Sequence, residues 1–176
     1  MAVECKLDGK IEARGSRQLT AIQHGVDAVP VESRSMARLE LHQLKTDKRA
    51  GELTALLSKL YESRARVVVW VADEGRRQIL DDYLWTYQKL AFLPHVLWGP
   101  NLGEVEEPIA LVGEPVNPNH ATVLVVGDDP PPGAWAATFD EVHDLIVPGK
   151  SGERRTEFWE QWKADPEKAD ETLAHE

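Results

Sequence analysis

The sequence predicts an α/β fold in which a mostly parallel sheet carries helices on both faces. Segments with the pattern of strands alternate along the chain with segments that have the pattern of helices. Several of the strands are continuous apolar runs, which is typical of parallel strands covered on both sides. The 176 residues, 42% of them hydrophobic, are enough for one such domain. We therefore expect a single-domain, Rossmann-like three-layer sandwich.

The first strand and helix of the domain are expected within residues 37–63. Residues 37–44, ARLELHQL, alternate apolar and polar side chains as a strand does. A helix over about 48–63 follows, and Thr46 or Asp47 is expected to cap it. The residues expected on the apolar face of this helix are Leu53, Leu56, Leu57, Leu60 and Tyr61.

The second strand and helix follow directly. Residues 66–72, RVVVWVA, form a continuous β-branched run and predict a strand buried on both faces. Asp73 is expected to cap a helix that ends near Trp85. The residues of this helix expected to face the core are Ile79, Leu80 and Leu84.

Three more strands are expected in the second half of the domain. PIALVGE at 108–114 and ATVLVVG at 121–127 are apolar runs of the buried kind. FDEVHDLIV at 139–147 predicts a further strand, at an edge of the sheet or inside it. The intervening DDPPPG at 128–133 is expected to form neither helix nor strand, because proline lacks the N–H that both require.

The ends of the chain differ in character from the domain. An amphipathic helix is expected from Ser151 to Lys163. Residues 36–164 are therefore assigned to the α/β domain, and residues 165–176 to an acidic tail that frays. Residues 1–35 lack periodicity and are interpreted as a poorly ordered extension.

Charge and composition disfavour several classes of protein. The formal net charge is −10, whereas binding to phosphate backbones requires concentrated Lys and Arg. Contact with DNA is therefore expected to be indirect, although direct binding of single-stranded DNA is a further alternative. Cys5 is the only cysteine, so the chain forms no internal disulfide. No apolar run approaches the roughly 18 residues of a membrane helix, and the N-terminus lacks a signal-peptide core. We expect a cytoplasmic protein with no membrane contact.

Motifs for catalysis and cofactor binding are missing. G-x-G-x-x-G follows no strand, and the nucleophile motif G-x-S-x-G does not occur. PGKS at 148–151 is similar to the end of a phosphate-binding loop, but the first glycine of that loop would fall at Asp144. The six histidines show no metal-ligand spacing. We predict a protein that is not an enzyme and holds no cofactor or metal. The alternative is a small nucleotide-handling α/β enzyme without a recognisable fingerprint.

One stretch is unusually rich in large apolar side chains: LDDYLWTYQKLAFLPH, at 80–95. Its L-W and F-x-P-H elements resemble a signature of the chi subunit of the bacterial DNA polymerase III holoenzyme. LELHQL, RVVVWVADE, FDEVHDLIVP and FWEQWKA are similar to other segments of that family. The resemblance covers about residues 37–164.

The resemblance implies a non-catalytic accessory protein of the clamp loader. Members of that family bind a psi subunit, or a DNA-repair helicase, on one face. In this chain the residues that match the psi face are Trp85, Phe92, Pro94 and His95. Without the resemblance, Trp85 and Phe92 are better interpreted as a helix end packed into the core. With it, we expect them to form an exposed interface.

The family also binds the acidic, hydrophobic C-terminal tail of single-stranded DNA-binding protein. The residues that match this site, together with a nearby arginine, are Arg154, Arg155, Trp159, Trp162 and Lys163. Trp159 stands where the family often has arginine, a role that Arg154 could take. The helical spacing of Arg155, Trp159, Trp162 and Lys163 allows one cationic and aromatic stripe. The alternative is that the aromatic side chains of this helix pack on the sheet, leaving only the charged ones in solvent.

Overall fold

The computed structural model describes residues 37–87 and 92–173. The expected extension, residues 1–35, and the last residues of the acidic tail, 174–176, lie outside the described residues. Within the described ranges, no helix is both long and apolar enough to cross a membrane.

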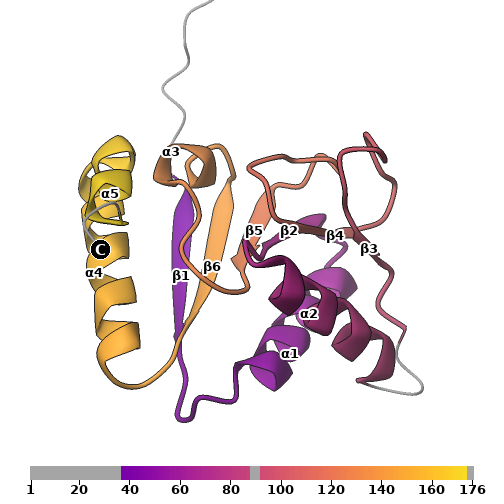
Figure 1. Cartoon of the computed structure of the whole chain (residues 1–176), viewed down its shortest axis with the longest axis horizontal. Coiled ribbons are helices and arrows are strands. Elements are labelled where there is room, and N and C mark those ends of the chain that lie inside the picture. Colours follow the sequence, from indigo (N-terminus) through magenta and orange to yellow (C-terminus); the bar gives the residue numbers. More distant parts are fainter. Residues whose placement is uncertain (1–36, 88–91, 174–176) are drawn as a thin grey trace, which may run out of the picture. The chain divides into compact units, whose positions relative to one another are not determined.

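The sheet has six strands, and all neighbouring strands are parallel, which confirms the predicted fold class (Figure 1). The strands are β1 (Arg38–Gln43), β2 (Val67–Trp70), β3 (His95–Leu97), β4 (Ile109–Val112), β5 (Val123–Val126) and β6 (Glu141–Ile146). Their spatial order is β1-β6-β5-β2-β4-β3, so β1 and β3 form the edges. The strand predicted at 139–147 is the inner strand β6.

The sequence analysis missed β3. This strand has only three residues, too few to show an apolar run or an alternation. It is held by its partner β4, with His95 opposite Ile109 and Leu97 opposite Leu111. Tertiary pairing, rather than local pattern, therefore makes this segment a strand.

Within residues 37–87 and 92–173, five helices cover the two faces of the sheet. They are α1 (Arg49–Glu62), α2 (Glu74–Thr86), α3 (Gly133–Ala136), α4 (Lys150–Ala164) and α5 (Pro166–Leu173). Residues of α1 and α2 pack in one apolar cluster, and residues of α3, α4 and α5 pack in another. Figure 1 shows α4 and α5 (yellow) on one side of the sheet and α1 and α2 (violet to magenta) on the other. The three-layer arrangement is as predicted.

The apolar strands supply both clusters because successive side chains of a strand point to opposite faces. In β2, Val67 and Val69 pack against the α1 and α2 side, whereas Val68 and Trp70 pack against the α4 side. All four are buried. This double burial is the reason that the run is continuously apolar rather than alternating.

Two details of α1 and α2 differ from expectation. The N-cap position of α1 is Lys48, which makes no side-chain capping bond, so neither Thr46 nor Asp47 is its cap. Asp73 caps α2 as predicted, accepting from the Arg76 amide at 2.7 Å. Ile79 was expected to face the core but is 70% exposed. The apolar stripe of α2 is narrow, since Leu80 and Leu84 are its buried residues.

Two short helices, α3 and α5, were not predicted. The segment 128–132 is irregular as expected, and only Gly133 of the predicted segment lies in α3. α3 follows the proline run, and its N-cap is Pro132, which needs no N–H at that place. The tail does not fray over Pro166–Leu173. Pro166 begins α5 there, and the Asp165 carboxylate accepts from the Glu167 amide at 3.2 Å. Buried Ala169 packs this helix into the apolar cluster that also contains residues of α3 and α4.

Candidate functional site

Two large aromatic side chains lie exposed beside each other at the end of α2. Trp85, in the last turn of α2, is 56% exposed, and Phe92, ahead of β3, is 63% exposed. Their ring centroids are 5.4 Å apart with an interplanar angle of 44°. Residues 88–91, which join them in sequence, lie outside the described residues. Trp85 and Phe92 form what we call the aromatic patch, and adjacent exposed aromatic rings are typical of surfaces that bind another protein.

His95 supports the aromatic patch from beneath. Its ring centroid lies 4.8 Å from that of Trp85, and its Nδ1 donates to the Leu93 carbonyl at 2.6 Å. Its Nε2 lies 3.3 Å from the Asp81 carboxylate on α2. His95 was expected in the partner interface itself, but it is only 7% exposed, so it positions Trp85 instead. Pro94 is half-buried between the patch and β3.

The expected cationic and aromatic stripe on α4 is wrong for three of its residues. Arg155, Trp159 and Trp162 are 8%, 0% and 1% exposed, so no partner can reach them as a surface stripe. The rings of Trp159 and Trp162 meet edge to face at 5.3 Å in the core, and the indole N–H of Trp162 donates to the Gly133 carbonyl. The aromatic side chains of α4 therefore pack this helix on the sheet, as the alternative interpretation of the sequence predicted.

Asp144 of β6 is the centre of a buried polar network beneath α4. Its side chain is fully buried and accepts hydrogen bonds from Arg49 at 2.8 Å, Arg155 at 2.5 Å and the indole of Trp159 at 2.6 Å. A fully buried anion is therefore held between a buried cation, Arg155, and a largely buried one, Arg49. Burial and the neighbouring charge of Arg155 lower the pKa of Arg49 to about 10, although Asp144 opposes this effect.

The remaining two residues of the predicted tail site are exposed but far apart. Arg154 and Lys163 are nine residues apart on α4 and so about 13 Å apart along its axis. Arg154 borders a pocket of about 320 Å³, which we call the α4 pocket. The α4 pocket is lined by Asp129, Pro130, Lys150, Ser151, Arg154, Arg155 and Phe158. The structure thus brings Arg154 and Arg155 together at one hollow and leaves Lys163 outside it.

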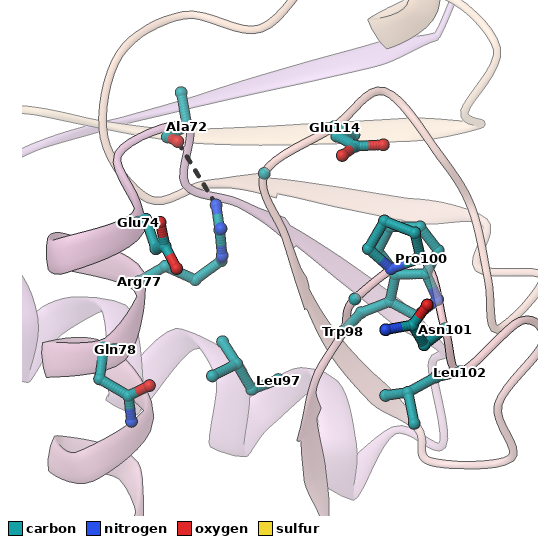
Figure 2. A pocket seen from close by; sticks show the side chains of 12 residues that line it. Ala72, Glu74, Arg77, Gln78, Leu97, Trp98, Pro100, Asn101, Leu102 and Glu114 are labelled. Atoms are coloured by element: carbon teal, nitrogen blue, oxygen red, sulfur yellow. Dashed lines mark hydrogen bonds between the residues drawn. The ribbon is translucent and has the colours of Figure 1, made fainter.

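A larger pocket, of about 610 Å³, opens at the carboxyl ends of β2, β3 and β4. This is the place where ligands bind in many open α/β sheets. Figure 2 shows Glu74 and Arg77 of α2 on one side of it, and Trp98 and Asn101 on the other. Arg77 crosses over Gly113 and donates to the carbonyls of residues 71 and 72, so its guanidinium is already engaged. With Glu74 and Glu114 as its acidic lining, this pocket does not suit a phosphate group.

Metal binding has no support in the part of the chain that the structure describes. No three or more His, Cys, Asp or Glu side chains gather there in a group that could hold an ion. His42 and His143 do meet, with Nε2 of His42 2.9 Å from Nδ1 of His143 and the rings stacked. Because these two nitrogens hydrogen-bond to each other, they do not present a pair of free ligands.

The histidine pair belongs to a charged ladder across β1 and β6. Nε2 of His143 lies 2.8 Å from Glu141, which pairs in turn with Arg38 at 2.5 Å, and Glu40 lies on the same face. Burial lowers the pKa of His143, Glu141 raises it in opposition, and His42 lowers it further, so that the net direction is down.

The stability of the domain is expected to fall as the pH drops from 7 towards 5, partly through His143. Its pKa is lower in the folded than in the unfolded chain, so the unfolded chain takes up the proton first and gains stability. The contribution is at most about 1.4 kcal/mol per pH unit for one proton. Urea unfolding across this range measures it. His143→Gln is expected to flatten the dependence, whereas the exposed control His120→Asn should leave it unchanged; equal slopes in all three proteins would contradict the assignment.

The sequence analysis missed the roles of Asp144 and Asp81. Asp144 interrupts an otherwise apolar stretch of a predicted strand, and a charged residue in a buried strand is a signal for a paired ion. Asp81 lies one residue after Leu80 on α2, where nothing in the sequence indicates that β3 would bring His95 to it. Its role depends on the strand that the sequence pattern does not show.

Comparisons with known proteins agree with one another. The family described as DNA polymerase III chi subunit, HolC, matches residues 36–168. A probable DNA polymerase III subunit chi of Rickettsia prowazekii is 35% identical over 72 residues, which are 40% of this chain and 42% of that protein. The DNA polymerase III subunit chi of Pseudomonas aeruginosa is 34% identical over 93 residues, 52% of this chain and 62% of that protein. The matches thus span less than two thirds of either relative.

Among solved structures, the chain is similar to the RNA helicase Prp28 of Chaetomium thermophilum bound to ADP. The TM-score is 0.50 and the sequence identity 8%, over 72% of this chain and 36% of the helicase. At that identity the likeness shows only that both contain the same kind of α/β sheet. The family match, in contrast, covers most of the chain and includes the aromatic patch and α4. The chain therefore belongs to the family of DNA polymerase III chi subunits.

Proposed function

We propose that this chain is a non-catalytic replisome accessory protein that joins two partners. A psi-like subunit of the clamp loader, or a repair helicase, docks on the aromatic patch. The C-terminal tail of single-stranded DNA-binding protein binds at α4, so the chain meets DNA only indirectly. The observation that carries the proposal is the adjacent, exposed pair Trp85 and Phe92 in a member of a polymerase-subunit family.

Several features of the aromatic patch support a docking role. Trp is among the residues that contribute most to protein interfaces, and two adjacent rings offer a large apolar area to a partner. His95, held between Asp81 and the chain of residue 93, packs against Trp85 from the buried side. A ring that is already oriented loses less conformational entropy when a partner binds.

The psi-like partner is tested by co-expression with the full chain. We expect the two proteins to co-elute from size-exclusion chromatography as one complex of equal stoichiometry. Separate elution of two folded proteins at micromolar concentration would contradict docking of that partner and leave the helicase as the one to test.

For the tail, the burial of three predicted residues favours the α4 pocket over a stripe along the helix. Lys150 and Arg154 line it and are cations that can pair with acidic side chains, and Pro130 is an apolar surface for a hydrophobic side chain of the tail. Six extended residues span about 20 Å, so a peptide anchored in the α4 pocket can reach Lys163. The site is thus expected to combine a pocket with one more distant cation.

A peptide with the tail sequence is expected to bind the full chain with micromolar affinity, and more weakly as salt increases, because exposed charges are screened. Lys150→Glu with Arg154→Glu should weaken binding by about tenfold or more, and Lys163→Glu by less. Isothermal titration calorimetry measures these affinities. Lys59→Glu, at an exposed position of α1, makes the same charge change as Lys163→Glu and half that of the double variant, and is the control for charge alone. An unchanged isotherm for the double variant would exclude the α4 pocket as the tail site.

A further inference from the structure

The buried histidine beneath the aromatic patch has one ring nitrogen that is satisfied and one that is not. Nδ1 of His95 lies 2.6 Å from the Leu93 carbonyl oxygen, which can only accept, so Nδ1 carries a proton. In a neutral imidazole with that proton, Nε2 holds a lone pair. Nε2 is buried and makes no hydrogen bond within the described part of the chain. The second ring nitrogen of His95 is therefore a buried polar atom that can take up a proton.

A carboxylate faces this nitrogen. Oδ1 of Asp81 lies 3.3 Å from Nε2 of His95, and their side chains are only 14% and 1% exposed, so water screens the contact weakly. A lone pair on Nε2 is repelled by the carboxylate, whereas a protonated Nε2 makes the imidazolium attract it. Of the described residues, Asp81 is the one charged side chain paired with His95. The other neighbours of the ring and its backbone are Leu93, Trp85 and, across the strand pair, Ile109.

The same ring packs against Trp85 of the aromatic patch. The two ring centroids are 4.8 Å apart, with an interplanar angle of 50°. A cation within about 6 Å of an indole centroid is attracted to the ring, so a charged His95 holds Trp85 more firmly than a neutral one. Asp81 and Trp85 are four residues apart on α2 and so lie one turn apart on the same side of the helix. A protonated His95 therefore contacts both of them from β3.

We propose that Asp81 and His95 are positioning residues that make docking at the aromatic patch depend on one proton. The proton comes from solvent, binds Nε2 of His95 and returns to solvent when it leaves. With it, His95 attracts both the Asp81 carboxylate and the Trp85 indole; without it, the lone pair and the carboxylate repel each other and Trp85 loses support. Histidine suits this role because its charge changes between about pH 5 and 8. The protonated form favours docking, so affinity decreases as the pH rises. This inference rests on the proposed docking function and describes its regulation.

The proton is tested first in the full chain without a partner, by the nitrogen chemical shifts of the His95 ring across about pH 6 to 8. We expect Nε2 to be protonated at the low end, and the indole N–H signal of Trp85 to change with the same midpoint. Asp81→Asn should remove this coupling, because its amide can donate to an unprotonated Nε2. Asp82→Asn, the same charge change at the exposed neighbouring position, should keep it. An Nε2 that stays unprotonated throughout, or a Trp85 signal that does not follow His95, would overturn the proposal.

The effect on docking is measured as the affinity for the psi-like subunit over the same pH range. The wild-type chain should lose about fivefold in affinity between the low and the high end. Asp81→Asn should show no such loss and should bind more tightly than the wild type at the high end, which a merely structural carboxylate would not produce. Asp82→Asn should follow the wild type.

Equal pH dependence in the wild type and Asp81→Asn would contradict the proposed regulation and leave the docking function standing. Absence of binding by every protein at every pH would instead remove docking of the psi-like subunit, and its regulation with it. The ring shifts of the chain alone would in that case still decide whether His95 takes up the proton beside Asp81.

Discussion

Removing the carboxylate of Asp144 is expected to lower the free energy of unfolding by about 3–5 kcal/mol. In Asp144→Ala, the buried guanidinium of Arg155 and the largely buried one of Arg49 lose the anion that they share, and the Trp159 indole N–H loses its acceptor. Arg49 keeps the Val126 and Asp128 carbonyls as acceptors, but a buried Arg155 cation without its carboxylate costs far more than the alanine gains by burying a methyl group. In a domain of this size the melting temperature should fall by roughly 10 °C or more.

The matched control is Asp140→Ala, at the residue directly before the same strand. Asp140 is exposed, and its contacts in the structure are made by its backbone. It should change the free energy of unfolding by no more than about 0.5 kcal/mol. Guanidinium unfolding at neutral pH compares the two variants. If Asp144→Ala were as stable as the control, the buried network would not contribute to the fold as inferred.

The second large effect is expected at the aromatic patch. Trp85→Ala or Phe92→Ala should weaken binding of a psi-like subunit by about 30-fold, or 2 kcal/mol, as at other aromatic hot spots. Most of the change should be a faster dissociation rate, because the patch carries no charge that would guide association. Surface plasmon resonance with the immobilised partner measures both rates. Stability should change little in Phe92→Ala, since the ring is 63% exposed.

Leu102→Ala serves as the control for the aromatic patch. Leu102 is a large apolar residue with 53% exposure, close to that of Trp85, but it lies in the loop between β3 and β4. Loss of affinity only in the two aromatic variants assigns the interface to the patch. Wild-type affinity in both aromatic variants would remove the patch as the docking surface.

The fold could be predicted from the sequence because a strand that is buried on both faces of a sheet is apolar at every position. The run at 66–72 is apolar throughout, and both of its faces are indeed covered. β3 left no such pattern, since its three residues are held by β4 and by the contact of His95 with Asp81. α5 was missed for a related reason: in an acidic segment, one buried alanine, Ala169, gives no visible apolar stripe.

The candidate site, unlike the fold, could not be predicted from local sequence patterns. Periodicity indicated that Trp159 and Trp162 share a face of α4, and this is correct, but it could not indicate that the sheet covers that face. The same limit applies to Ile79, which continues an apolar stripe on α2 yet is 70% exposed.

What the sequence alone determined is the class of fold, the order of its long elements and the family that its motifs resemble. These depend on local periodicity and on residue identity. Only the tertiary structure decided which side chains are available to a partner. Exposure depends on what the rest of the chain places over a residue: α4 lies on the sheet and hides Arg155, whereas Trp85 and Phe92 stay uncovered at the end of α2. The partners inferred for this protein therefore depend on the exposed pair and on the α4 pocket.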